Sequence, residues 1–472
     1  MFGARWFEGL VLCFYSVRAI GSTPFRYDVI IGVKVEQDRE AGFMSTSEFD
    51  KYKVDHLFLL IGENPLPNYV AARLLLNQGG TLYLVHTTHT AKPATRLAKI
   101  LGDELIGLKK AELVSLNEYE SDACKIKEAI ISQLKIDPKI DNGRIGLNGT
   151  IGLNYTGGTK AMAVHAYRTV FSPDRPDTVF SYLDPRKLEM CIDSDNTPIE
   201  PIKIKPEVLA VKLAELFKIH GLDLKAKPTQ EAQLPDLAAT LAKIFKEEDK
   251  AKHWFNWYCK VFCEEARRKR NGSWGDWKSK SDLAGLSISL EKAPPEVITY
   301  LKLKNLVIAD NQLSLQAVQQ QGIFQQIKQF CKYLDGLWLE HYVLQQVKNI
   351  AAQHSINDYG LNFEVPLMGT RDGFEFDVAF TRGYQLFAIS VSTTSKRDLC
   401  KVKLFEAYLR ARQMGGDEAR VALICCTNEP DGLKAELAVL DDKKIAVFGR
   451  EDLINLSSKI EAWIKQNDKD AR

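Results

Sequence analysis

The sequence predicts an α/β protein with three parts: a doubly wound sheet, a mostly helical middle segment and a second α/β unit. Three observations support this prediction. Apolar runs of strand length alternate with helical patterns over residues 55–205, as in a parallel sheet covered on both faces. Residues 206–330 carry mainly the apolar spacing of helices. Residues 331–472 read as a helix, three strands, a helix and a strand.

Length and composition agree with a globular protein of two or three domains. The chain has 472 residues, of which 45% are hydrophobic and 26% charged. The formal charge of +2 is near balance, so any nucleic-acid surface must be local. The nine cysteines show neither a CxxC pair nor zinc spacing, which is typical of reduced thiols and predicts a cytoplasmic protein.

Residues 1–54 read as an N-terminal extension of unknown role. Residues 9–14 faintly resemble a signal peptide, but this apolar run is short and Arg18 follows closely. No stretch approaches the roughly 18 apolar residues that span a membrane, so no membrane partner is expected.

Residues 55–205 repeat a strand–helix unit. Strands are expected at residues 56–61, 81–86, 111–115, 151–155, 178–183 and 188–192, and helices at 68–77, 93–101 and 121–134. Ligands bind such sheets at the carboxyl ends of the strands. Three loops are therefore expected to converge there: residues 62–67, 87–90 and 156–160.

The most informative stretch is IGLNYTGGTKAMAVHAY, residues 151–167. An apolar strand runs into the tight turn of residues 156–160, which opens a helix. Glycines let the backbone approach a ligand, and a helix start presents unpaired N–H groups, so the turn suits a phosphate. It is neither a P-loop nor a GxGxxG fingerprint, which leaves the ligand open. The alternative is a tight turn without a ligand.

The middle segment combines basic and aromatic residues. A helix is expected over residues 252–270, ending in the run Arg267-Arg268-Lys269-Arg270, and Trp274 and Trp277 follow. Residues 282–290, 295–301 and a hairpin at 306–315 look like a winged helix. Basic residues beside aromatic ones are typical of surfaces that track nucleic acid. The alternative is a solvated helix end beside a hydrophobic core.

The last section carries a strand with two acids. A helix is expected at residues 333–352, strands at 361–365, 374–380 and 385–394, a helix at 398–414 and a strand at 420–426. In FEFDV, residues 374–378, alternation along the strand points Glu375 and Asp377 to the face opposite the phenylalanines. A divalent cation would satisfy two such carboxylates, with Glu340 as a third ligand. The alternative is a solvated strand face.

This order of elements resembles the PD-(D/E)XK nuclease core, with Asp377 in the place of the metal-binding aspartate. Together with the Gly157-Gly158 unit, the chain resembles the CRISPR-associated CARF–PD-(D/E)XK ancillary nucleases of type III systems. The resemblance covers roughly residues 55–470 and is carried by NPLPNY, NYTGGTKAM, GLWLEHYV, FEFDV and QLFAIS. It implies a Rossmann-like CARF sensor domain at 55–205, a helical, winged-helix-like segment at 206–330 and a restriction-endonuclease-like domain at 331–472.

The resemblance also implies an activity. In that family a cyclic oligoadenylate, usually the tetramer, binds across a CARF homodimer and activates a metal-dependent nuclease that cuts DNA or RNA. Mg²⁺ or Mn²⁺ would be held by Glu340, Glu375 and Asp377. The ligand-contacting residues would be Asn64, Thr87, Thr156, Gly157, Gly158, Thr159, Lys160 and Met162.

One departure from the family pattern bears on catalysis. The family's third strand carries E-x-K, whereas Ser390 and Ser392 stand at this spacing here. Metal-assisted phosphodiester cleavage needs charge at the phosphate, which neither hydroxyl supplies. Lys396 is the first candidate substitute, and Lys401, Lys403 and Glu406 lie on the next helix.

Two hypotheses follow from this departure. The first is a cyclic-oligoadenylate-activated nuclease whose catalytic groups include Asp377, Glu375, Ser390, Ser392 and Lys396. The second is a cyclic-oligoadenylate sensor with a degenerate nuclease-like domain, which binds nucleic acid or a partner without cutting.

Overall fold

A computed structural model describes residues 47–134, 147–173, 175–193, 198–224, 226–270, 273–308, 311–365, 374–436 and 442–471. The chain divides into two compact units, Met1–Thr46 and Ser47–Arg472. The first unit, and with it most of the predicted N-terminal extension, lies outside the described residues. The second unit opens with a short 3-10 turn, η1 (Asp50–Tyr52), just before its first strand.

The second unit begins with a seven-stranded sheet of order β3-β2-β1-β4-β5-β6-β7. Its strands are β1 (Val54–Leu60), β2 (Leu76–His86), β3 (Lys110–Ser115), β4 (Ile151–Asn154), β5 (Val179–Asp184), β6 (Glu189–Asp193) and β7 (Glu200–Lys203). The pairs from β3 to β5 are parallel, and β6 and β7 continue the sheet in antiparallel fashion. The six predicted strands are confirmed, although β2 begins five residues early. The short β7, which contains Pro201, was not predicted.

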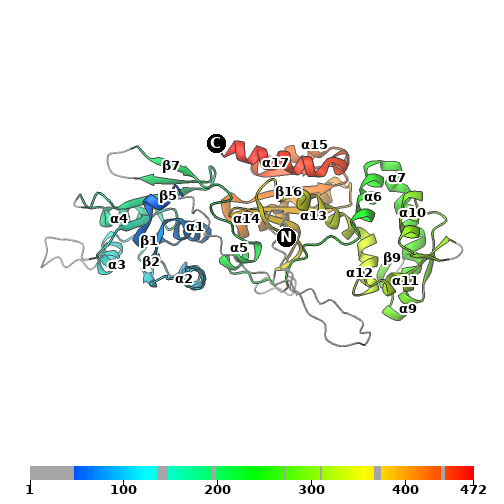
Figure 1. The fold of residues 1–472 in the computed structure, drawn as a ribbon, viewed down its shortest axis with the longest axis horizontal. Coiled ribbons are helices and arrows are strands. Elements are labelled where there is room, and N and C mark those ends of the chain that lie inside the picture. The colour runs from blue at the N-terminus through cyan, green and yellow to red at the C-terminus, as the bar shows by residue number, and fades with distance from the viewer. Residues whose placement is uncertain are drawn as a thin grey trace, which may run out of the picture. The chain divides into compact units, whose positions relative to one another are not determined.

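Two pairs of helices cover the two faces of this sheet (Figure 1). They are α1 (Leu66–Leu75), α2 (Ala91–Glu104), α3 (Ala123–Leu134) and α4 (Lys160–Val170). In β1, Leu57 and Leu59 pack with α1 and α2, whereas Phe58 and Leu60 pack with α3 and α4. Because both faces are covered, the strand is apolar at successive positions, which explains the continuous runs in the sequence.

The middle segment contains helices and several short strands. Its elements are α5 (Leu213–Ile219), α6 (Pro235–Lys246), α7 (Glu248–Trp257), the π-helical turn η2 (Tyr258–Phe262), α8 (Cys263–Ala266), β8 (Arg267–Arg270), β9 (Ser273–Trp277), α9 (Lys280–Ala284), β10 (Ser287–Ser289), α10 (Pro295–Leu303), β11 (Val307–Ile308), β12 (Gln312–Ser314), α11 (Leu315–Gln320) and α12 (Ile327–Lys332). The strands β10, β12 and β11 form a small antiparallel sheet, which includes the predicted hairpin.

One prediction for this segment is wrong. The helix that begins in α7 ends at Ala266, and the basic run forms strand β8, paired with β9. The pairing sets Arg267 opposite Trp277 and Lys269 opposite Trp274. Each cation lies over the indole of its cross-strand partner, an attraction that an extended backbone permits and a helix end does not. The basic run is therefore part of a β-hairpin and not a solvated helix end.

The C-terminal part is a five-stranded sheet of order β13-β14-β15-β16-β17. Its elements are the π-helical turn η4 (Tyr333–Leu337), α13 (Trp338–Ile350), β13 (Ile356–Val365), β14 (Phe374–Arg382), β15 (Gln385–Ser392), α14 (Arg397–Gly415), η5 (Gly416–Glu418), β16 (Arg420–Cys425), α15 (Pro430–Glu436), η6 (Asp442–Lys444), β17 (Ile445–Phe448), η7 (Arg450–Asn455) and α17 (Leu456–Asp470). The first three strands are antiparallel and the last three parallel. The predicted order of elements is confirmed.

Two helices on opposite faces of this sheet position the candidate site. α13 packs on the face that holds Phe387 and Ile389, and α14 packs on the face that holds Leu386 and Ala388. The single helix predicted at 333–352 is broken at Gly336, whose φ of 156° is not helical. The break lies within η4, two residues before α13 begins at Trp338, and Asp335 immediately precedes it.

Candidate active site and ligand-sensing loops

The carboxylate of Asp377 is held at the end of the β14–β15 pairing. Its Oδ2 accepts hydrogen bonds from the backbone N–H of Val391 at 2.5 Å and from the Ser390 hydroxyl at 3.1 Å. The backbone pairing of β14 with β15 reaches only to Val378 and Ile389. Beyond that point the Asp377 side chain accepts from the N–H of Val391. Burial raises the pKa of Asp377, and the nearby Lys403 ammonium opposes that rise.

The strict alternation predicted for residues 374–378 does not hold at Asp377. Phe376 and Val378 are both buried, but they belong to clusters on opposite faces of the sheet. They pair with Phe363 and Leu361, and Asn362 between those two has a φ of 63°. A left-handed residue in one strand disturbs the pleat locally, so period-two alternation fails there.

Glu375 lies in β14 opposite Glu364, but its side chain is outside the described residues. Its predicted pairing with Asp377 on one face therefore stays a prediction.

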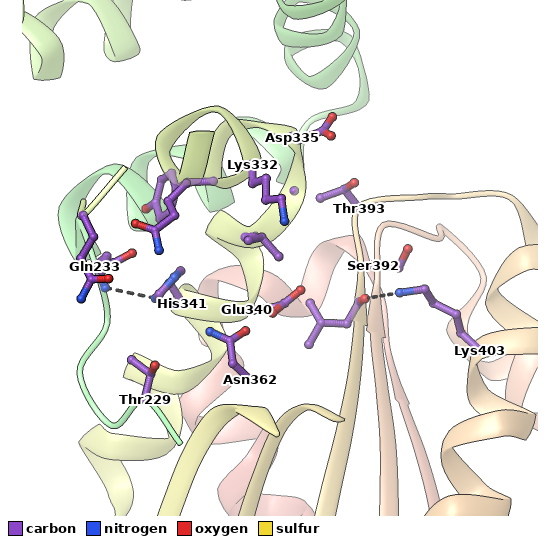
Figure 2. A pocket seen from close by; sticks show the side chains of 16 residues that line it. Thr229, Gln233, Lys332, Asp335, Glu340, His341, Asn362, Ser392, Thr393 and Lys403 are labelled. Atoms are coloured by element: carbon purple, nitrogen blue, oxygen red, sulfur yellow. Dashed lines mark hydrogen bonds between the residues drawn. The ribbon is translucent and has the colours of Figure 1, made fainter. Parts of the chain in front are cut away.

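A cavity of about 710 Å³ opens at the carboxyl end of β15. Figure 2 shows Glu340 of α13, Lys332 of α12 and Lys403 of α14 pointing toward the same space from three elements. The full lining is Thr229, Gln233, Gln325, Gln329, Lys332, Tyr333, Asp335, Gly336, Leu337, Glu340, His341, Asn362, Val391, Ser392, Thr393 and Lys403. Acidic and basic groups thus face one another around a polar space.

Lys403 connects this cavity to Asp377. Its Nζ donates to the carbonyl oxygen of Val391 at 2.9 Å (Figure 2), and the N–H of the same residue donates to Asp377. One residue of β15 therefore joins the cation and the carboxylate. Lys403 of α14 thus brings a positive charge into the cavity that the uncharged Ser392 also lines.

The other predicted catalytic residues differ in whether they contact Asp377 or line the cavity. Ser390 bonds to Asp377, and Ser392 lines the cavity. Lys396 does not line it: β15 ends at Ser392, and Lys396 is an exposed residue at the N-terminal cap of α14. The strand predicted at 385–394 ends two residues early, at Ser392, so Lys396 does not extend the row of Ser390 and Ser392.

His341, a titratable residue that lines the cavity, is held in its neutral form. His341 is 5% exposed, and its Nδ1 accepts from the backbone N–H of Gln233 at 3.1 Å. Burial lowers the pKa of this imidazole to about 4. His341 is therefore uncharged near neutral pH and positions the loop before α6.

The described side chains contain no cluster of three or more histidine, cysteine, aspartate or glutamate residues close enough to hold a metal. That set includes Glu340 and Asp377 but not Glu375, whose side chain lies outside it. The carboxylates of Glu340 and Asp377 are hard oxygen donors of the type that Mg²⁺ and Mn²⁺ prefer. The donor type therefore fits a divalent cation, and the complete ligand set depends on Glu375.

In the first sheet, three glycines meet where the strand order changes direction between β1 and β4. A Cβ on Gly62 would lie 3.3 Å from the backbone nitrogen of Gly158, and one on Gly157 would collide with the Leu60 carbonyl oxygen. Gly158 has a φ of +73°, which side-chain-bearing residues rarely adopt. The result is a surface of bare backbone at the position where open α/β sheets bind ligands.

The predicted ligand-contacting residues divide into exposed and structural ones. Gly158, Thr159 and Lys160 are exposed at the start of α4, where the Thr159 hydroxyl accepts from the N–H of Met162 at 3.1 Å. Met162 itself is fully buried, so it packs beneath the glycine turn. The Thr156 hydroxyl accepts from the N–H of Leu183 at 2.7 Å.

Two further predicted contacts lie in the neighbouring loops. Thr87 is 5% exposed and bonds to Thr90, which closes the loop after β2. Asn64 accepts from the N–H of Leu66 at 3.0 Å, and its amide lies against Gly416 at the end of α14. Asn64 therefore links the loop after β1 to the turn that follows α14.

A residue that the sequence reasoning missed is Asn68. It is fully buried, donates to the Leu60 carbonyl at 2.9 Å and keeps its Oδ1 beside Gly157 without a hydrogen-bond partner among the described residues. The sequence could have indicated this role, because Asn68 is a polar residue within the apolar stripe of NPLPNY. A buried amide at such a position needs a hydrogen-bond partner, which is often a backbone group.

Comparisons with known proteins identify solved structures that share this fold. No family model matches the chain, and no curated protein matches its sequence. The solved structure of VC1899 from Vibrio cholerae is similar, with 16% identity, 87% of this chain and 98% of that chain covered, and a TM-score of 0.61. Can2 from Sulfobacillus thermosulfidooxidans, solved in complex with cyclic tetra-adenylate, shows 17% identity, coverage of 88% and 98%, and a TM-score of 0.58.

These similarities extend over nearly the whole length of both solved chains. Identities this low establish likeness of fold alone. The predicted fold class, and the resemblance to CARF–nuclease proteins as a likeness of fold, are confirmed. Within the described residues, no helix combines the length and apolar character needed to cross a membrane.

Proposed function

We propose that this protein is a nuclease of type III CRISPR antiviral defence, activated by a cyclic oligoadenylate and dependent on a divalent metal. The observation that carries the proposal is the bonding of Lys403 and Asp377 to the same residue, Val391, at the edge of a cavity that Glu340 also lines. A carboxylate of raised pKa beside a positioned cation is an arrangement expected of a catalytic site.

The activator is proposed from the first sheet. Gly62, Gly157 and Gly158 expose backbone at the β1–β4 switch point, and Lys160 adds a positive charge at the start of α4. Both features suit the phosphates of a nucleotide ring. Can2, whose fold this chain shares, was solved with cyclic tetra-adenylate, which supports that ring as the first to test.

A homodimer is part of the proposal. One face of α14 exposes four large apolar side chains at helical spacing, namely Leu399, Val402, Phe405 and Leu409, which are 52%, 64%, 44% and 48% exposed. A contiguous apolar stripe on a helix surface is typical of a protein interface. A two-fold pair of chains would cover the stripe and offer a ring-shaped ligand two identical loop sets.

In the proposed reaction, Asp377 and Glu340, with Glu375 as predicted from the sequence, would hold Mg²⁺ or Mn²⁺. The bound cation would supply an activated water and charge stabilisation at the phosphate. Ser390 and the Val391 N–H orient the Asp377 carboxylate. Lys403 would face the scissile phosphate and offset the negative charge that develops there.

The second candidate is a sensor whose nuclease-like domain no longer cuts. It is favoured by Ser390 and Ser392, neither of which carries a charge. The double substitution Ser390→Glu and Ser392→Lys separates the candidates. Cleavage that appears only in this variant would support the degenerate-site interpretation.

The decisive experiment is a cleavage assay with the purified full chain and Mn²⁺ or Mg²⁺. Substrates are supercoiled plasmid, single-stranded DNA and RNA, each with cyclic tri-, tetra- or hexa-adenylate or without a ring. We expect cleavage with one ring only, and loss of cleavage but not of ring binding in Asp377→Ala. Lys396→Ala is the matched control for Lys403→Ala and should retain activity. Unchanged cleavage in Asp377→Ala would remove the metal-site assignment.

A further inference from the structure

The β8–β9 hairpin concentrates positive charge in a chain that is nearly neutral. Residues 267–280 contain six basic residues and one acidic residue, a formal charge of +5, whereas the whole chain carries +2. Arg268 and Lys269 are exposed, and Lys280 is exposed at the start of α9. Such a local excess of charge attracts a polyanion.

Aromatic rings are interleaved with these cations. The Arg267 guanidinium lies 3.9 Å from the centre of the Trp277 ring, and the Lys269 ammonium lies 5.6 Å from that of Trp274. Trp274 is 37% exposed, so part of its indole ring is accessible. Cations beside an accessible indole form a platform on which an unpaired base stacks while its phosphates are neutralised.

The hairpin is attached to the rim of the candidate active site. Arg267 forms an ion pair with Asp335, and the Tyr258 hydroxyl donates to the other oxygen of that carboxylate at 2.5 Å. Asp335 and Lys332 both line the cavity that contains Glu340 and Lys403. A nucleic-acid strand bound on the hairpin would therefore lie next to the cavity.

We propose that the β8–β9 hairpin binds single-stranded nucleic acid and leads it into this cavity. A single strand fits better than a duplex because stacking on Trp274 requires a base whose face is free. The inference deepens the proposed function, since it names the form of the substrate. Binding itself does not require that the cavity cut.

The test measures binding without cleavage. The full chain carrying Asp377→Ala, in the presence of a chelator, is titrated with labelled single-stranded DNA, single-stranded RNA and duplex DNA, and fluorescence anisotropy is recorded. Trp274→Ala should weaken single-strand binding about 5- to 150-fold, which corresponds to the ~1–3 kcal/mol of one stacked base. Trp274→Phe keeps a ring and should retain most of the affinity.

The charge contribution is tested with Arg268→Ala and Lys269→Ala together. This pair should weaken binding and flatten the dependence of log affinity on log salt by about 0.7 for each phosphate that the protein no longer neutralises. Lys459→Ala and Lys465→Ala, which remove two exposed lysines from α17, are the matched control and should have little effect.

The outcomes distinguish the two proposals. Full single-strand affinity in both Trp274→Ala and the Arg268/Lys269 variant would overturn this inference, as would a loss confined to duplex DNA. If these variants lose single-strand binding while the parent chain never cleaves, the hairpin inference holds and the nuclease proposal fails.

Discussion

Glu418 provides a test of the structure that is independent of the proposed activity. It lies at the end of η5, its side chain is fully buried, and neither carboxylate oxygen has a hydrogen-bond partner among the described residues. Burial raises its pKa from the ordinary value of 4.5 to about 7. The folded protein therefore keeps the proton at pH values where the unfolded chain has released it.

The sign and size of the effect on stability follow from this difference. Between pH 4.5 and about 7 the folded state binds more protons than the unfolded state, so the free energy of unfolding falls as pH rises. A shift of about 2.5 pKa units at 1.36 kcal/mol each amounts to about 3 kcal/mol over that range. Glu418→Gln cannot ionise and should not show this loss.

We expect the variant to gain about 3 kcal/mol over the parent chain between pH 4.5 and pH 8. Urea unfolding of both proteins at several pH values in this window measures the difference. Glu451→Gln, which changes an exposed carboxylate, is the control and should follow the parent. A Glu418→Gln difference that is the same at every pH would refute the reasoning, because it would mean that this carboxyl has an ordinary pKa.

Three further predictions concern the proposed active site, the proposed ligand contact of Lys160 and the proposed dimer. Lys403→Met should lower cleavage about 10²- to 10³-fold and move the acid limb of the rate profile to higher pH, because Asp377 loses the cation that opposes the rise of its pKa; an unchanged pH profile would contradict this. Lys160→Ala should weaken binding of the activating ring without changing the melting temperature, as calorimetric titration would show, since this side chain is exposed. Phe405→Glu should convert the proposed dimer to a monomer in light scattering, whereas Ile106→Glu, at a position 88% exposed and off this stripe, should not.

The parts of the fold that the sequence predicts are those with strong local patterns. The strands of the first sheet are continuous apolar runs because both faces are covered, and helix α14 ends at Gly415, just before Gly416, whose φ is 64°. The glycine turn before α4 was also recognisable, since two adjacent glycines between an apolar strand and a helical pattern are typical of a tight strand–helix turn.

The misassigned features depend on contacts between distant residues. Whether Arg267 ends a helix or begins a strand is decided by Trp277 on the opposite strand. The choice between Lys396 and Lys403 depended on where β15 ends, and only the packing of α14 brings Lys403 to Val391. Similarly, the broken alternation at Asp377 originates in Asn362, a residue of another strand.

The contact of Asn64 with Gly416 has a mechanical consequence. α14 runs unbroken from Arg397 to Gly415, so Lys403 lies about 18 Å along a stiff rod from the end that touches the first sheet. Gly416 leaves no room for a side chain beside the Asn64 amide, so the two residues are in close contact. A close-packed contact transmits a displacement of one residue to the other. A shift of the loop after β1 would thus reach the lysine as an axial movement of a single helix.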